Sequence, residues 1–154
     1  EDYESCLPLF EAMGNNINYE GAAGAGQNTK LANQIMIAGT ISGLCEALSY
    51  AKAKGLDLQT LLDSVATGAA GSRQLDTLAP RILKGDFVSG IFYSKHFIKD
   101  MKLAASEAKS EELDLNVLER VLDNYETLAE AGCEEDGTQA LIKFYEKCET
   151  GKEN

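Results

Sequence analysis

The sequence predicts an all-α fold built around one long central helix. Between residues 28 and 54, apolar side chains recur at steps of three and four, as in Leu31, Ile35 and Ala38. From residue 21 onward, no segment alternates apolar and polar residues with a period of two, so no strand is expected there. The 154 residues are enough for one domain with its own core.

Shorter helices are expected before and after the long one. Residues 3–13 predict a helix that Gly14 ends, and INYE, residues 17–20, predicts a short strand that either pairs outside the chain or is an extended linker. Asn28 or Thr29 is expected to cap the long helix. The remaining helices are expected at residues 57–65, 72–83, 94–109, 116–131 and 138–148, and the expected caps are Asp57, Ser72, Asn116 and Thr138.

The composition argues against several classes of partner. A formal net charge of −11 and a pI near 4.5 repel phosphate backbones, so no nucleic acid is expected. No run of about 18 apolar residues is available to span a membrane, and the acidic start EDYESCLPLF does not resemble a signal peptide. Four cysteines without a C-x-x-C pair and a single histidine predict no metal site. Reduced thiols and a cytoplasmic location are expected.

The middle of this acidic chain is basic and can hold a small anion locally. Arg73, Lys95 and His96 can attract a carboxylate, although a solvated face is the simpler interpretation. An aromatic-rich loop is expected at residues 87–93, where Phe92 and Tyr93 either line a pocket or, more simply, fill the core. Cys45 lies in an apolar helical stripe and is expected in the core.

The stretch GAAGAGQNTKLANQ, residues 21–34, allows three interpretations. A dinucleotide loop would need a third glycine where Thr29 stands, followed by a second strand that the sequence does not predict. A plain helix entry needs only small residues for a sharp turn. A site built around Lys30 would place Asn33 and Gln34 on the same helix face, beside the free backbone N–H groups of the glycine turn. Such a group can bind a carboxylate or hydroxyl and perform acid–base chemistry.

Four motifs in order along the chain resemble those of the β-hydroxyacid dehydrogenase family. The glycine stretch is similar to its G-x-x-G-x-G-x-x-x-K-x-x-N signature. The later segments CEALSYAKAKGLDLQTLLDSV, GAAGSRQLD and FIKDMKLA resemble the motifs that follow in that family. The beginning, EDYESCLPLFEAMGNNINYEG, is similar to the last helix and strand of the family's nucleotide domain. The family includes 3-hydroxyisobutyrate dehydrogenase, tartronate semialdehyde reductase and 6-phosphogluconate dehydrogenase.

The resemblance implies a domain boundary and a set of site residues. Residues 1–20 would be the end of a truncated N-terminal NAD(P)-binding Rossmann domain, in keeping with a start at Glu rather than Met, and residues 21–154 a C-terminal helical catalytic and dimerisation domain. Lys30 falls on the family's catalytic lysine, the general acid/base. The substrate would be held by Asn33, Gln34, Gly24 and Ser72, and the cofactor would be approached by Lys99 and Asp100. Many members have a second asparagine where this chain has Gln34, and Ser72 can also be only a helix cap.

The resemblance also implies an activity and partners. The expected function is that of an NAD(P)-dependent oxidoreductase acting on a small carboxylic acid, a short β-hydroxy acid or its semialdehyde or keto form. NAD or NADP would be bound mainly by the N-terminal domain, so the isolated chain is expected to be inactive. A homodimer formed through the helical domain is also expected. The alternative is a non-catalytic helical dimerisation module that keeps the family scaffold.

Overall fold

The computed structural model describes residues 2–88 and 92–150, with side chains up to residue 146. In these residues the secondary structure is helical apart from two isolated β-bridges, which confirms the all-α class. The expected loop at 87–93 includes residues 89–91, which lie outside the described residues. The elements in chain order are α1 (Asp2–Met13), α2 (Ala25–Ala53), α3 (Leu58–Val65), α4 (Arg73–Leu83), α5 (Ser94–Ser110), α6 (Asn116–Glu130), the 3-10 turn η1 (Thr138–Leu141) and α7 (Ile142–Thr150).

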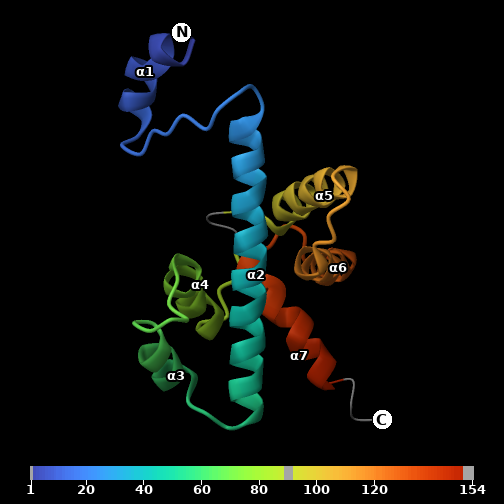
Figure 1. Ribbon diagram of the computed structural model, residues 1–154. Helices are drawn as coiled ribbons and strands as arrows, with labels where there is room; N and C mark the ends of the chain where they lie inside the picture. The colour runs from blue at the N-terminus through green and yellow to red at the C-terminus, as the bar shows by residue number, and fades with distance from the viewer. Residues whose placement is uncertain (1, 89–91, 151–154) are drawn as a thin grey trace.

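The long helix α2 is the centre of the fold, as its apolar pattern predicts. It contacts α3, α4, α5, α6, η1 and α7. Figure 1 shows α3 and α4 on one side of α2, with α5, α6 and α7 on the other. By length and composition alone, α2 could also cross a membrane. Helices at the centre of folded domains often meet that criterion, and the contacts of α2 are those of a core helix.

The beginning of α2 corrects the expected cap. The helix begins at Ala25, and its N-cap is Gly24, whose φ of 92° lies in the left-handed region that favours glycine. Neither Asn28 nor Thr29 caps it. The Thr29 hydroxyl instead donates to Glu20 Oε2 at 2.9 Å, across the turn that leads into the helix. Because the helix starts earlier than expected, Lys30 lies in its second turn.

Residues 2–20 form no strand, so of the two alternatives for residues 17–20 the structure shows the linker, and pairing outside the chain stays a prediction. A strand is defined by hydrogen bonds to a neighbouring strand, and the described residues contain none to pair with it. Helix α1 lies apart from the bundle beyond the N-terminal end of α2 (Figure 1), and none of its residues is buried. Its Tyr3 ring packs against Phe10 and Tyr19. The origin of this segment in a nucleotide domain stays a prediction.

Of the four caps expected after the long helix, two are confirmed and two are wrong. The side chains of Asp57 and Ser72 accept hydrogen bonds from the backbone N–H groups three residues later, at 2.8 and 3.1 Å. At the other two helices the N-caps are Leu115 and Gly137, without a side-chain bond, because each chain turn falls one residue before Asn116 and Thr138. The last helical segment moreover begins as a 3-10 turn before it becomes α7.

Aromatic side chains hold α5, α6 and η1 together. Phe97 of α5 and Tyr125 of α6 are fully buried and meet edge to face, with ring centroids 5.3 Å apart. The Tyr125 hydroxyl donates to the Thr138 carbonyl at 2.6 Å, which ties η1 to α6. Cys45 of α2 is buried in this core, as expected, and burial raises the pKa of its thiol to about 12. This packing fixes the positions of α5 and η1 relative to α2.

Candidate active site

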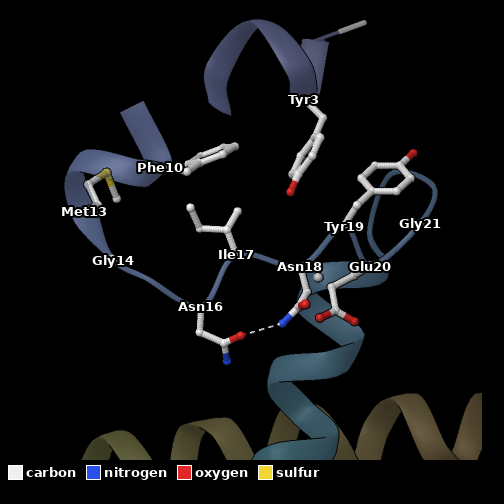
Figure 2. Close-up of a pocket in the computed structure, with 11 residues that line it drawn as sticks. Tyr3, Phe10, Met13, Gly14, Asn16, Ile17, Asn18, Tyr19, Glu20 and Gly21 are labelled. Atoms are coloured by element: carbon white, nitrogen blue, oxygen red, sulfur yellow. Dashed lines mark hydrogen bonds between the residues drawn. The ribbon is translucent and has the colours of Figure 1, made fainter. Parts of the chain in front are cut away.

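Of the two largest cavities found among the described residues, the one beside α1 carries little chemistry. It has a volume of about 490 Å³ and lies between α1 and the segment that leads to α2. Figure 2 shows that Tyr3, Phe10, Ile17 and Tyr19 dominate its lining, and Glu20 is its only charged side chain. An aromatic and aliphatic hollow with one carboxylate can pack against an apolar surface, but it brings together no acid–base pair.

The second cavity gathers most of the residues expected at the site. It has a volume of about 640 Å³ and is formed by α2, α4, α5 and η1, together with Phe92 just before α5. Among its lining residues are five expected ones, Lys30, Asn33, Gln34, Lys99 and Asp100. Segments about seventy residues apart in the sequence therefore meet at one place. The other two expected site residues, Gly24 and Ser72, are not among the residues that line it.

Asp100 is the centre of the polar cluster in this cavity. Its side chain is only 2% exposed, and Lys30 Nζ lies 3.0 Å from Oδ2 while Lys99 Nζ lies 3.0 Å from Oδ1. Gln34 Nε2 also donates to Oδ2, at 2.9 Å. Burial alone would raise the pKa of Asp100, but hydrogen bonds from Lys99, Lys30 and Gln34 outweigh it and lower that pKa below the ordinary value. Asp100 is therefore a fixed negative charge around which two lysines are arranged.

The side chain of Gln34 makes its hydrogen bonds within the protein, unlike a side chain that is free to bind substrate. It is buried. Its amide nitrogen donates a hydrogen bond to Asp100, and its side-chain carbonyl oxygen accepts one from Asn33 Nδ2 at 3.4 Å. The longer side chain of glutamine, compared with asparagine, spans from α2 to the carboxylate on α5. In the described structure Gln34 thus fixes Asp100 and Asn33. Its expected contact with substrate stays a prediction.

Lys30 is placed so that it can reach a ligand. Half of its side chain, 49%, is exposed, and its ammonium is held at the cavity wall by Asp100. A charged donor at such a position can pass a proton to an oxygen in the cavity and recover one from water. No group of three His, Cys, Asp or Glu side chains in the described part of the chain could hold a metal ion. One carboxylate and two lysines at a cavity wall are groups that can bind an anion or transfer a proton.

Several lining residues were not expected from the glycine stretch or from the K-D motif, the Lys99–Asp100 pair within FIKDMKLA. Gln74 and Thr77 come from α4, and Thr138 and Gln139 come from η1. No sequence signal marks them, because they join the cavity only through the packing of α4 and η1 on α2. Of the basic residues in the middle of the chain, Arg73 and His96 line the cavity.

Lys95, Phe92 and Tyr93 each make contacts within the protein. Lys95 does not line the cavity and instead pairs with Glu135 at 2.6 Å. Phe92 lines the cavity and also packs on the buried Phe97 ring, so it has both positions that the sequence allows. Tyr93 is partly exposed and stacks edge to face on His96. The cavity wall near α5 is therefore aromatic as well as basic.

Ser72 caps α4, and a substitution can separate that role from substrate binding. Ser72→Ala is expected to lower the free energy of unfolding by about 1 kcal/mol, the ordinary effect of losing a helix cap. Because Ser72 lies outside the cavity, the affinity of this cavity for a small carboxylate should change less than about twofold. Urea denaturation and a binding titration check the two parts. A tenfold loss of affinity at unchanged stability would restore Ser72 as a ligand-binding residue.

Known proteins resemble this chain in sequence. Residues 24–145 match the family described as NAD-binding of NADP-dependent 3-hydroxyisobutyrate dehydrogenase. The chain is 47% identical over 147 residues to the uncharacterized oxidoreductase YkwC of Bacillus subtilis, an alignment that covers 96% of this chain and 51% of the relative. It is 44% identical over 140 residues to the probable mitochondrial 3-hydroxyisobutyrate dehydrogenase-like protein 1 of Arabidopsis thaliana, covering 91% and 41%.

A solved structure shows the same fold. The 3-hydroxyisobutyrate dehydrogenase of Mycobacterium tuberculosis, solved with L-serine, superposes with a TM-score of 0.80 at 29% identity, over 91% of this chain and 50% of that one. The chain thus spans about half the length of the relatives it matches.

Proposed function

Because the chain belongs to the NADP-dependent 3-hydroxyisobutyrate dehydrogenase family, we propose that it is the helical part of an NAD(P)-dependent oxidoreductase. The proposed reaction interconverts a short β-hydroxy acid and its semialdehyde or keto form. The observation that carries the proposal is the Lys30–Asp100 ion pair of 3.0 Å at the wall of the cavity. The M. tuberculosis relative was solved with L-serine, which is itself a three-carbon β-hydroxy acid.

Lys30 is proposed as the general acid/base. In the reductive direction its ammonium donates a proton to the carbonyl oxygen of the semialdehyde. In the oxidative direction the amine takes the proton of the hydroxyl. Asp100, ionised because its pKa is lowered, holds Lys30 Nζ at the cavity wall in either direction. A single well-placed acid or base contributes about 10²- to 10⁴-fold to rate.

We propose that the nicotinamide end of the cofactor lies at the open part of the cavity. Lys99 keeps 62% of its side chain exposed although its Nζ is paired with Asp100, so it can contact a polar group of the cofactor. When bound, NAD(P) supplies the hydride acceptor or donor. Lys99 and Asp100 are the residues of this chain proposed to lie near it, and most of the cofactor contacts are proposed to come from a nucleotide domain outside these 154 residues.

The polar groups of α2 suit a small carboxylate. Asn33 lies one helical turn beyond Lys30 and lines the same cavity, so the two can hold a hydroxyl and a carboxylate side by side. Gly24 lies outside the cavity at the exposed start of α2, so substrate contact there would require backbone N–H groups of the turn. We propose Asn33 as the substrate amide and leave Gly24 as a weaker candidate.

The proposal is tested by turnover. The full-length enzyme containing this chain should oxidise NADH or NADPH with at least one of four substrates: glyoxylate, succinic semialdehyde, tartronate semialdehyde or methylmalonate semialdehyde. The 154-residue chain alone should give no measurable rate with the same mixtures. Turnover by the isolated chain would contradict the proposal that a separate nucleotide domain supplies most of the cofactor contacts. No turnover of any substrate by the full-length protein would favour the non-catalytic scaffold.

The chain is also proposed to self-associate through α2. Met36 and Tyr50 expose 66% and 65% of their surface on this otherwise central helix, so apolar area remains that a second copy can cover. A dimer mass is expected from light scattering at micromolar concentration. A strictly monomeric mass under those conditions would contradict the proposed dimer.

A further inference from the structure

One cation in the cavity has no part in the proposed proton transfer. Arg73, the first residue of α4, lines the cavity with Gln74 and Thr77 of the same helix. Lys30 and Lys99 both pair with Asp100, but no carboxylate of the described residues lies within ion-pair distance of the Arg73 guanidinium. A cation in the first turn of a helix is mildly disfavoured by the helix dipole. The Arg73 side chain is exposed, so its guanidinium is free to meet an anion that enters the cavity.

The charges of the residues that line the cavity also favour an anionic ligand. Lys30, Lys99 and Arg73 are positive and Asp100 is the only acid among them, although the whole chain has a formal net charge of −11. One substrate carboxylate would offset one of the two excess positive charges. A second anionic group on the same substrate would offset the other. A substrate with two carboxylates therefore matches the cavity better than a monocarboxylate does.

The position of Arg73 separates it from the proton-transfer pair. Lys30 lies on α2 and Asp100 on α5, whereas Arg73 belongs to α4, which lies on the other side of α2 from α5 (Figure 1). The cavity of about 640 Å³ extends between these helices over η1. A ligand that contacts both Lys30 and Arg73 must therefore carry two polar groups, one for each helix.

Arginine suits this role because its guanidinium is planar and always charged, and it binds a carboxylate through two parallel hydrogen bonds. His96 adds an imidazole to the same lining from α5. Gln74 offers an amide next to Arg73. His96 lies one helical turn before Asp100 on α5, so these groups continue the polar lining from α5 to α4.

From this geometry we propose that Arg73 recognises a second carboxylate on the substrate, so that the preferred substrate is a dicarboxylic β-hydroxy acid. This inference rests on the proposed function of the same cavity. Chemically, such a substrate is 3-hydroxyisobutyrate with its methyl group extended to a carboxymethyl group, which is 2-(hydroxymethyl)succinate. The two compounds share the reacting hydroxymethyl group and first carboxylate and differ in the distal charge.

The test compares these two substrates in the full-length enzyme. Wild type is expected to show a kcat/KM at least about tenfold higher for 2-(hydroxymethyl)succinate than for 3-hydroxyisobutyrate. Arg73→Gln should reduce kcat/KM for the dicarboxylate by about 10- to 100-fold, mainly through KM, and change the value for the monocarboxylate less than about twofold. Arg73→Lys should retain part of the preference because the charge remains. Lys95→Gln, which removes a cation of α5 outside the cavity, is the matched control.

Each alternative gives a different result. An equal loss for both substrates, with a raised KM for NAD(P), would mean that Arg73 contacts the cofactor, and would overturn the proposal. The same loss in Lys95→Gln would reduce the effect to net charge and overturn it too. If 3-hydroxyisobutyrate is oxidised in a Lys30-dependent way but the dicarboxylate is not preferred, the further inference fails while the proposed function stands.

A binding measurement keeps the proposal testable without turnover. Succinate and butyrate have the same carbon chain and differ in one carboxylate. In an NMR titration of the 154-residue chain, succinate is expected to bind about tenfold more tightly than butyrate, to shift the Arg73 side-chain signal, and to lose this advantage in Arg73→Gln. Equal affinities for the two acids would overturn the proposal.

Discussion

Replacing Lys30 with alanine in the full-length enzyme is expected to lower kcat by about 10²- to 10⁴-fold, the contribution of one positioned acid–base group. The Lys30 side chain is half exposed and makes its ion pair with Asp100 at the cavity wall. Its removal should therefore leave the helical fold intact while it takes away the proton donor. Initial rates measure the loss, and circular dichroism checks the fold.

Two controls sharpen this result. Lys102→Ala removes an exposed lysine of α5 that pairs with Glu126 at 2.7 Å and does not line the cavity, and it should leave kcat within about twofold of wild type. Added methylamine should restore part of the activity of Lys30→Ala, because a small amine can enter the space left by the side chain. Normal turnover in Lys30→Ala would remove Lys30 from the chemistry.

Asp100→Asn is expected to lower kcat by about 10²-fold, because the variant keeps the shape of the side chain but loses the charge that holds Lys30 in place. Both lysines of the cluster would lose their counter-ion, whereas Gln34 could still donate to the amide oxygen. Asp123→Asn, which changes an exposed carboxylate of α6, is the matched control. A kcat within twofold of wild type would show that the ion pair is only structural.

The same substitution should change how stability depends on pH. The pKa of Asp100 is lower in the folded chain than its ordinary value of 3.8, so its stabilising contribution is complete above that pH. The contribution is lost as the pH falls below about 4 and through the lower pKa of the folded state. The difference in unfolding free energy between wild type and Asp100→Asn is thus expected to shrink on acidification. Urea denaturation at a series of pH values measures it, and a difference that grows in acid would contradict the lowered pKa.

Local patterns in the sequence predicted much of this fold. The central helix follows from its apolar periodicity, and Asp57 and Ser72 cap their helices because each lies where the chain turns into an apolar pattern. Asn28 was a wrong choice of cap, because Gly24 can adopt the left-handed conformation of the turn and so starts the helix earlier. A cap depends on backbone conformation, which residue type alone does not determine.

Part of the site could also be predicted from local patterns in the sequence. The spacing of Lys30, Asn33 and Gln34 places them on one helix face, and the structure puts all three in the cavity. The pairing of Lys30 and Gln34 with Asp100 joins segments about seventy residues apart, and no local pattern encodes such a contact. It could be anticipated only from the family's K-D motif. That Gln34 turns toward Asp100 depends on how closely α5 packs on α2.

The strand expected at residues 17–20 shows where a local pattern is not enough to predict structure. Its residues favour an extended chain, but a strand also needs a partner, and the described residues provide none. The sequence favours a solvated face for Arg73 of α4, and the structure does keep this side chain exposed. Only the packing of α4 and η1 on α2 shows that it lines the cavity with Lys30.

The central claim is that Asp100 acts on the reaction through Lys30, and a double-mutant cycle on kcat tests it most directly. Full-length enzyme would be measured as wild type, Lys30→Ala, Asp100→Asn and the double variant, with the same substrate and cofactor. If Asp100 serves only to hold Lys30, the double variant should be no slower than Lys30→Ala. If the two losses multiply, the residues act independently, and the ion pair is not the proton-transfer centre proposed here.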